Sequence, residues 1–324
     1  IGMGSTGQRY AFLSSKILNN NSNIFGVRRD IYKPLNKSFY YEFIERNISF
    51  IEISELKGKI SQSDKVIICT PNIKHLEDYI KIREFFKGDI LIEKPLCHNL
   101  SSYKKARLIS DKKCWVSFQY RYSQSLKILK DLIHKKEEKN GFHFRIYHTD
   151  DVRFWHPWED FQKSYSTRDN LGGGCLNTLN HALDLVNFLL GMPESNFIKK
   201  TNISNLMNKC DDAYEAIFIF SKLKKIKHIC SVGANYASPN KQFSINVTTF
   251  DNEYNLNLLN GELAKTNYYN KKPFNKIIVP AQDPQIIREK MFTDMLNSFI
   301  NNTKKLFCPS LNEVAEFFIK LNIN

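Results

Sequence analysis

The stretch from Ile90 to Pro95 constrains the fold of this chain more than any other. Its apolar run ends abruptly at Glu93 and Lys94, and such a run bounded by charge predicts a buried parallel strand. Pro95 has no N–H to donate to a strand ladder, so Lys94 is expected at the carboxyl end of the strand. Open α/β sheets bind their ligands at that end. The alternative, an ordinary surface turn after a strand, is outweighed by the features described below.

A second strand with polar groups at its carboxyl end precedes this one. The apolar run 66–69 predicts a strand, a helix is expected over about 76–86, and a further short strand is expected at 115–118. Alternating strands and helices predict a doubly wound parallel sheet, in which the carboxyl ends of neighbouring strands meet at one crevice. The polar group at the end of the second strand consists of Thr70, Pro71, Asn72 and His75.

The chain opens on a glycine motif, G-x-G-x-x-G, which dinucleotide-binding proteins place between their first strand and first helix. The first glycine permits a tight turn, the second lets the backbone approach a pyrophosphate, and the third lets the helix pack close to the strand. A helix up to about residue 17 and a strand at 24–27 follow, as this interpretation requires, and we expect a strand before Ile1. The N–H groups that start the helix then face the phosphates. The candidate cofactor-binding residues are Gly2, Gly4, Ser5, Thr6 and Gly7.

Arg28 and Arg29 follow that strand, where NAD-binding sites usually carry an acidic residue for the ribose hydroxyls. A guanidinium group binds a 2′-phosphate through a charged planar fork, whereas a carboxylate repels it. The two arginines therefore favour NADP over NAD as the cofactor. The alternative is that both are surface residues and that Asp30 contacts the ribose of NAD.

The second half of the chain is rich in strand patterns. Apolar residues recur at helical spacing over 123–136 and over 286–300, and a helix is expected at each. We predict a Rossmann-type dinucleotide-binding domain over 1–118 and an α/β domain with a mostly antiparallel open sheet over 119–324. The strands of that sheet are expected at 142–147, 213–220, 226–234, 243–250 and 254–259.

Two segments of this half carry side chains suited to ligand binding. The loop 154–168 concentrates aromatic, imidazole and charged groups, and the triple glycine 172–174 opens an apolar helix. On that helix Asn177, His181 and Asp184 lie at i, i+4 and i+7 and are expected to share one face. A single histidine in an apolar helix is usually a core residue, but one beside two polar groups indicates a site. The candidates for substrate contact are Arg121, His156, Trp158, Tyr165, Arg168 and Asn180.

Composition narrows the partners of the chain. The net charge of +14 accompanies abundant Lys, Asn, Ile, Phe and Tyr without a long block of like charges, so no nucleic-acid partner is expected. Seven cysteines without a CxxC pair argue against a metal site and a disulfide framework, and favour the reducing cytoplasm. The most apolar window, 182–192, is interrupted by Asp184 and Asn187 and is too short to cross a bilayer, so no membrane partner is expected.

These segments, in this order, resemble the Gfo/Idh/MocA family of NAD(P)-dependent oxidoreductases, which includes glucose-fructose oxidoreductase and inositol dehydrogenase. Residues 156–168 further resemble members found with bacterial surface-sugar pathways. The matching segments are the glycine motif with Gln8 and Arg9, residues 70–75, Glu93-Lys94-Pro95, residues 119–122, and the triple glycine leading to His181 and Asp184.

The resemblance implies a Rossmann domain followed by an α/β domain whose open sheet forms the interface of a homodimer or homotetramer. It places Glu93 and Lys94 in the cofactor site and turns Lys94 and His181 towards the nicotinamide and substrate. The chain is thus expected to be a dehydrogenase or reductase acting on a secondary alcohol or ketone of a sugar. His181 would be the general base, and Lys94 would stabilise the alkoxide.

One departure from the family concerns Asn177, where many members carry an aspartate. An amide cannot relay a proton, so either Asp184 orients His181 or activity is reduced. The alternative function is therefore a nucleotide-binding sensor of the same fold without turnover.

The charge of the substrate also stays open. Arg121 and Arg168 favour an anionic sugar derivative, whereas the amides and Asp184 suit a neutral polyol.

Overall fold

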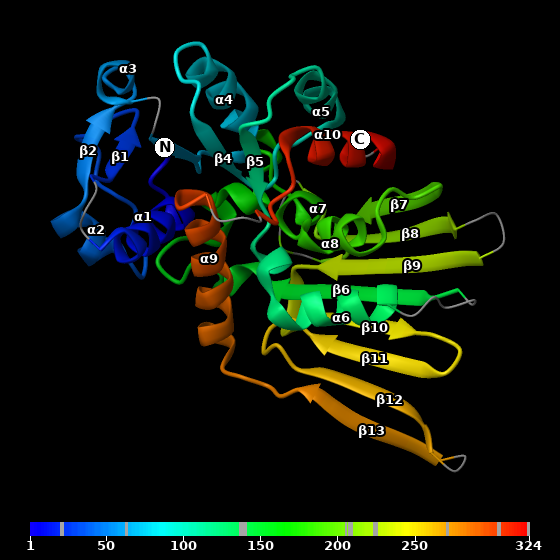
Figure 1. Cartoon of the computed structure of the whole chain (residues 1–324). Helices are drawn as coiled ribbons and strands as arrows, with labels where there is room; N and C mark the ends of the chain where they lie inside the picture. Colours follow the sequence, from blue (N-terminus) through cyan, green and yellow to red (C-terminus); the bar gives the residue numbers. More distant parts are fainter. Residues whose placement is uncertain are drawn as a thin grey trace.

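The structure, a computed structural model, describes residues 1–19, 23–61, 64–135, 141–204, 206, 210–222, 226–269, 272–302 and 306–322. An amino-terminal α/β part lies beside a large eight-stranded sheet, and helices fill the space between them (Figure 1). The predicted fold class, a parallel doubly wound part plus a mostly antiparallel open sheet, is confirmed.

Parallel strands form the centre of the amino-terminal part. β1 (Phe25–Arg28) pairs with β2 (Ser49–Glu52), while β3 (Lys65–Ile68), β4 (Asp89–Glu93) and β5 (Cys114–Ser117) form a three-stranded sheet. The buried residues of β4 are fully apolar, as expected for a strand covered on both faces. The helices of this part are α1 (Ser5–Leu18), α2 (Tyr41–Asn47), α3 (Leu56–Lys59), α4 (His75–Arg83) and α5 (Leu100–Arg107).

Ile1 and Gly2 lie between the two parallel sheets. The amino group of Ile1 donates to the carbonyl oxygen of Ile67 at 2.6 Å, and the Gly2 N–H donates to that of Val27 at 3.1 Å. The start of the chain thereby connects β1 to β3 in the parallel order of a doubly wound sheet. A cavity of about 600 Å³ lies beside Ile1 in the gap between the two sheets, and its lining runs from Asp64 at one end of β3 to Cys69 at the other.

The eight-stranded sheet has the order β13-β12-β11-β10-β6-β9-β8-β7. All its neighbouring pairs are antiparallel except β6 and β9, which run parallel. Strands β7, β12 and β13 were not expected from the sequence, because β7 and β13 are largely exposed and their residues show little alternation of burial. The strands are β6 (His143–Asp151), β7 (Ser195–Thr201), β8 (Ala213–Lys222), β9 (Ile226–Asn235), β10 (Ala237–Thr248), β11 (Asn252–Asn257), β12 (Leu263–Tyr269) and β13 (Lys272–Val279).

Helices α6 (Gln124–Lys135), α7 (Cys175–Thr178) and α8 (His181–Leu190) cover one face of this sheet (Figure 1). The expected helix at 123–136 is thus present, although residue 136 lies outside the described residues. α9 (Pro284–Ile300) runs back to pack against α1 and the short helix η2 (Gln119–Tyr122). No helix in the described ranges is both long and apolar enough to span a bilayer.

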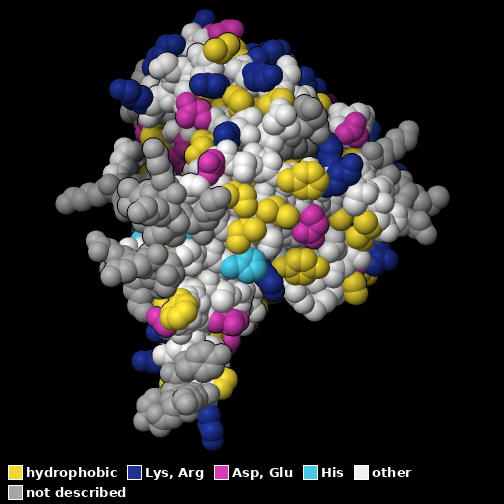
Figure 2. Space-filling view, turned by 90° about the vertical axis from the view of Figure 1, so that its right-hand side faces the viewer, with side chains coloured by type: hydrophobic (Ala, Val, Ile, Leu, Met, Phe, Trp, Pro, Cys, Tyr) yellow, Lys and Arg dark blue, Asp and Glu magenta, His cyan; other side chains and the backbone are white. Residues whose placement is uncertain are grey.

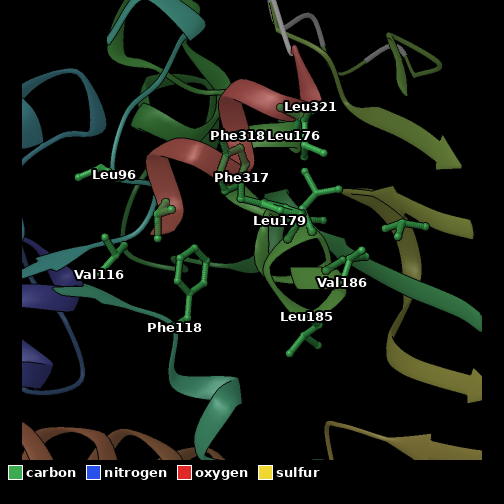
Figure 3. Packing of buried hydrophobic residues seen from close by; sticks show 14 of the residues in the cluster. Leu96, Val116, Phe118, Leu176, Leu179, Leu185, Val186, Phe317, Phe318 and Leu321 are labelled. Atoms are coloured by element: carbon green, nitrogen blue, oxygen red, sulfur yellow. The ribbon is translucent and has the colours of Figure 1, made fainter. Parts of the chain in front are cut away.

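The last helix, α10 (Leu311–Leu321), joins the two parts of the molecule and was not expected from the sequence. It packs against α5 and β5 of the amino-terminal part. Figure 3 shows its Phe317 and Phe318 between Val116 of β5 on one side and Leu176 and Leu179 on the other. The two parts therefore share one hydrophobic core. The division into two domains at residue 118 stays a prediction from the sequence.

Candidate active site

Lys94 lies at the carboxyl end of β4, as the sequence predicts, and faces the break between α7 and α8. Its Nζ donates a 2.6 Å hydrogen bond to the carbonyl oxygen of Thr178. Burial lowers the pKa of Lys94, Glu93 opposes that shift, and the charge of Arg288 adds to it. The ammonium group is therefore held at a fixed point and is less costly to deprotonate than an ordinary surface lysine.

His181 begins α8 and is buried beside η2. Its ring packs edge-on against Tyr120, with centroids 4.9 Å apart, and against Phe118 at 5.7 Å. Burial lowers the pKa of His181 well below 6.5, and the charge of Lys94 lowers it further. The imidazole is consequently neutral at neutral pH and can accept a proton.

A second histidine, His148, lies near His181 and was not identified as a site residue from the sequence. It stacks on Phe243 with ring centroids 3.9 Å apart, and its ring lies 6.5 Å from that of His181. Burial and the charge of Lys94 lower the pKa of His148 to about 3. A signal was present: Phe144, Ile146 and His148 alternate on the buried face of β6, and the histidine comes at the carboxyl end of that strand.

Buried polar atoms around Lys94 have no hydrogen-bond partner within the described part of the chain. Leaving such an atom unsatisfied costs about 1–3 kcal/mol, so a group of them in one place indicates a site that a ligand or water completes. Gln119 lies within this group, since its Nε2 is 3.3 Å from Nε2 of His181. The atoms are Thr70 Oγ1, Gln119 Oε1, His148 Nδ1, Asn180 Oδ1 and Nδ2, and His181 Nδ1.

Asp184 does not orient His181, contrary to one of the expectations above. Its carboxylate accepts from Arg121 Nη2 at 2.7 Å and from Arg121 Nε at 2.9 Å, and Glu313 of α10 accepts from the same guanidinium at 3.1 Å. Burial raises the pKa of Asp184, and the bidentate Arg121 opposes that shift and keeps the pair ionised. Arg121 and Asp184 thus fasten α8 to η2 and α10 instead of contacting a substrate.

The helix predicted to carry Asn177 and His181 on one face is interrupted. Asn177 belongs to α7, His181 begins α8, and residues 179 and 180 turn the chain between them. The Asn177 amide donates to the carbonyl oxygens of Gly172 at 3.2 Å, Gly173 at 3.3 Å and His98 at 3.3 Å. An aspartate would place negative charge against these three oxygens, which explains why an amide suits this position.

The glycine motif forms the cradle that the sequence predicts. Gly2 has a φ of +84°, and a Cβ on Gly7 would lie 2.0 Å from the carbonyl oxygen of Gly2, so neither position accepts a side chain. A Cβ on Gly4 would meet nothing within 4 Å, and α1 begins there without a side-chain cap. Ser5 and Thr6 therefore present free backbone N–H groups to open space, which suits a pyrophosphate.

His75 and Glu93 form buried or half-buried hydrogen bonds that hold the ends of β3 and β4 in place. The fully buried His75 ring lies between the carbonyl oxygens of Pro95 at 2.6 Å and Thr70 at 2.7 Å, and it connects the two strand-end turns. Glu93 accepts hydrogen bonds from the hydroxyls of Tyr10, at 2.5 Å, and Ser117. Both residues can therefore act on a bound dinucleotide only by positioning the backbone beside it.

The turn between these strand ends is tied to the triple glycine. The Asn72 amide donates to the carbonyl oxygen of Gly172 at 3.0 Å, and Asn72 is buried in the contact. A Cβ on Gly172 would lie 2.9 Å from Cβ of His98, so the close approach requires glycine there. Pro71 precedes the short helix η1 (Asn72–Lys74) and ends the strand segment.

The residues after β1 have separate roles. The Arg28 guanidinium donates to the carbonyl oxygens of Ile31 at 3.3 Å, Lys33 and Pro34, and thereby holds its own loop together. Asp30 accepts the N–H groups of Tyr32 and Lys33 in the same loop. Arg29 is exposed, and its side chain makes no hydrogen bond to any residue in the described ranges. Of the two predicted arginines, Arg29 is the one available for a cofactor phosphate.

The loop over 152–171 crosses from the large sheet to the amino-terminal part. It contains four short helices, η3 (Val152–Phe154), η4 (Phe161–Lys163), η5 (Tyr165–Thr167) and η6 (Asp169–Leu171). Trp158 packs edge-on against Phe39 with ring centroids 4.9 Å apart, and His156 stacks on Trp158 and pairs with Glu159 at 2.7 Å. Tyr165 is 37% exposed, and desolvation by the surrounding protein, followed by the charge of Glu93, raises the pKa of its phenol to about 12. Arg168 is exposed beside Tyr165.

Comparison with known proteins supports the fold at low sequence identity. No protein-family model and no curated protein matches the chain. Levoglucosan dehydrogenase in complex with NADH and levoglucosan is similar over 98% of this chain and 93% of its own, with a TM-score of 0.74 and 15% identity. A protein described as an NADPH-dependent oxidoreductase from Desulfitobacterium hafniense is similar over 99% and 92%, with a TM-score of 0.76 and 16% identity.

A third solved structure agrees with these two. The protein described as oxidoreductase YvaA from Bacillus subtilis covers 99% of this chain and 93% of its own, with a TM-score of 0.69 and 13% identity. In all three cases the similarity extends over both parts of the chain. At 13–16% identity these matches show the fold alone: the chain has the fold of levoglucosan dehydrogenase and of these oxidoreductases, as the resemblance described above implies.

Proposed function

We propose that the chain is an NAD(P)-dependent oxidoreductase that moves a hydride between a nicotinamide and a secondary alcohol or ketone of a sugar-like substrate. The observation that carries the proposal is that a half-buried ammonium, Lys94, and a neutral imidazole, His181, lie among buried polar atoms without hydrogen-bond partners in the described part of the chain. Hydroxyl groups satisfy donors and acceptors at once, so a polyol is the ligand class that this group fits. The glycine turn lies beside the end of the strand that leads to Thr70, because a Cβ on Gly2 would lie 2.7 Å from Thr70 N.

The residues divide the chemistry as follows. In the oxidative direction the carbinol hydroxyl gives its proton to His181, and Lys94 stabilises the developing alkoxide. The hydrogen on the carbinol carbon leaves with its electron pair as a hydride, and the nicotinamide accepts it when bound. The C–H and O–H bonds break as the carbonyl double bond forms, and reduction is the reverse. His148 and Asn180 have free polar atoms that can orient neighbouring hydroxyls.

We propose NADP as the preferred cofactor and NAD as the alternative. The support is Arg29, which is exposed after β1, whereas Asp30 is engaged in its own loop and is poorly placed to take the ribose hydroxyls. The similar solved structures include one named with NADH and one described as NADPH-dependent, so both cofactors occur on this fold.

We further propose a homo-oligomer, a dimer or tetramer, formed through the uncovered face of the large sheet. Its neighbouring strands β7, β8, β9 and β6 expose Phe197, Ile217, Ile229 and Tyr147, which are 65%, 45%, 40% and 42% exposed. Apolar patches of this kind mark protein interfaces. Figure 2 looks at the molecule from the ends of these strands, where hydrophobic side chains lie among charged ones at the end of the sheet. The seven free cysteines suit a cytoplasmic location.

The test is a sugar panel with the purified chain. Reduced cofactor fluorescence reports binding, and absorbance at 340 nm reports turnover in either direction. We expect binding of NADPH or NADH and turnover with at least one polyol, sugar or keto-sugar. Cofactor binding without turnover across a panel that includes surface-polysaccharide sugars would support the sensor, whose motivation was Asn177. If neither NADPH nor NADH binds, both the oxidoreductase and the nucleotide-binding sensor are rejected.

A further inference from the structure

Two arginines from distant parts of the sequence meet at the edge of the candidate active site. Arg9 lies on α1, and its guanidinium carbon is 4.9 Å from the ring centroid of Phe292 on α9. Arg288 lies one turn before Phe292 on the same helix, and α9 packs along α1 (Figure 1). The two guanidinium groups are therefore neighbours, and we call them the arginine pair.

The acidic residues nearby are engaged elsewhere. On α9, Glu289 pairs with Lys16 at 3.3 Å and Asp294 pairs with Lys290 at 3.4 Å. Asp150, on β6, pairs with Lys241 at 2.6 Å. Within the described ranges no carboxylate forms an ion pair with either member of the arginine pair; Arg9 has only a 3.4 Å hydrogen bond to the Tyr40 hydroxyl. Two like charges side by side are unfavourable unless an anion joins them.

The arginine pair lies beside the candidate active site. Arg288 is exposed on α9, and α9 packs against η2, the short helix that carries Tyr120. The ring of Tyr120 packs edge-on against that of His181, with centroids 4.9 Å apart. Besides desolvation, the charge of Arg288 lowers the pKa of Lys94 and of His181, and the charge of Arg9 lowers the pKa of Arg288.

We propose that Arg9 and Arg288 bind the anionic group, a carboxylate or phosphate, of the sugar-like substrate whose carbinol lies at Lys94 and His181. The inference rests on the proposed function and specifies its substrate class as an anionic sugar derivative. Guanidinium groups bind such oxygens bidentately, and two of them converge here without an acidic partner. Arg121, which the sequence suggested for this role, is occupied by Asp184 and Glu313.

The same chemistry could serve the pyrophosphate of the dinucleotide, because Arg9 follows the glycine motif by two residues. The position of Arg288 favours the substrate: α9 packs against η2, whose Tyr120 contacts His181, whereas the turn at Gly4 offers the phosphates backbone N–H groups of α1. The experiment below separates the two sources by measuring cofactor and sugar binding independently.

The experiment uses the full chain saturated with reduced cofactor. D-Glucuronate and glucose 6-phosphate serve as carboxylate and phosphate probes, and D-glucose serves as the neutral probe. Each Kd is obtained from the rise of Tm with probe concentration. We expect tighter binding of at least one anionic probe than of glucose in the wild type. In Arg288→Gln and in Arg9→Gln/Arg288→Gln, the Kd of that probe should rise roughly 10- to 100-fold, as for lost hydrogen bonds to a charged group.

Two controls make the outcome decisive. Lys290→Gln removes the same charge from α9 at a residue that pairs with Asp294, and it should keep the anion preference. The Kd of the reduced cofactor alone should be unchanged in the Arg288→Gln variant. A tenfold rise in cofactor Kd would assign the pair to the dinucleotide, and equal stabilisation of the wild type by charged and neutral probes, or by none, overturns the proposal. Failure of the wild type to bind cofactor rejects the proposed function instead.

Discussion

The ring of His148 lies 6.5 Å from the ring of His181, and both imidazoles are held neutral by burial and by the charge of Lys94. A neutral imidazole with a free ring nitrogen can accept or donate one hydrogen bond to a substrate hydroxyl. The two histidines come from the end of β6 and the start of α8, so the site is assembled from two elements with no helical register between them.

Replacement of His148 by phenylalanine should keep the stacking on Phe243 and remove the hydrogen bond that the imidazole would make to a substrate hydroxyl. We expect kcat/KM for the sugar to fall roughly tenfold, the scale of one hydrogen bond, with an unchanged Kd for the reduced cofactor. His228→Phe is the control, since that ring stacks on Phe142 in the same sheet and lines a separate cavity of about 400 Å³ beside Leu190. Equal losses in both variants would show that only packing was disturbed.

Replacement of Lys94 by methionine should lower the rate of hydride transfer by roughly 10²-fold or more, because a preorganised charge at the alkoxide is lost. Cofactor affinity should change little. Single-turnover absorbance at 340 nm and cofactor fluorescence measure the two effects separately, and Lys81→Met on the exposed face of α4 controls for loss of a lysine. A wild-type rate in Lys94→Met would remove this residue from the chemistry.

The pH dependence of the reaction should differ from that of an exposed histidine. A general base is inactive when protonated, and burial and Lys94 place the pKa of His181 well below 6.5. The rate should therefore be flat on the acid side through pH 6.5 and should fall only at clearly lower pH. A kcat/KM profile between pH 5 and 9 checks this. An ascending limb centred near 6.5 that persists in His181→Ala would assign the limb to another group.

Arg29→Asp should reverse the cofactor preference. An attraction for the 2′-phosphate becomes a repulsion, which shifts the ratio of NADP to NAD affinity by about 2 kcal/mol. Arg28 is unsuitable for this test because its guanidinium holds the carbonyl oxygens of its own loop. Arg46→Asp, on the exposed last turn of α2, is the control for general charge effects. Equal Kd values for the two cofactors in the wild type would contradict the assignment.

Asn177→Asp tests whether the chain has lower activity because it carries an amide where many members of the family carry an aspartate. The new carboxylate would face the carbonyl oxygens of Gly172, Gly173 and His98, so we expect the free energy of unfolding to fall by about 1–3 kcal/mol without a gain in turnover. Asn257→Asp, at an exposed residue of β11 whose side-chain oxygen accepts the N–H of Leu259, is the control for general charge effects. Higher turnover in Asn177→Asp at unchanged Tm would instead support the view that the natural chain is an impaired sensor.

Much of the scaffold was readable in the sequence because it depends on local pattern. The apolar run before Glu93 predicted β4 and the position of Lys94 at its carboxyl end, and the glycine spacing predicted the turn into α1. The exposed edge strand β13 was missed, since a strand with little buried surface lacks the alternation that marks it in a sequence.

The roles of the polar residues were decided by tertiary contacts. Helical spacing placed Asp184 beside His181, but Arg121 and Glu313 reach the carboxylate from η2 and α10 and take it out of the site. Likewise Arg9 and Arg288 meet only because α9 returns across the chain to α1. The strength of an ion pair depends on the distance between its charges in space, and a pKa shift depends on burial. Neither the distance nor the burial can be read from the spacing of residues in the sequence. The sequence therefore determined which groups are present and at which strand ends, whereas only the folded packing determined which are satisfied and which are left for a ligand.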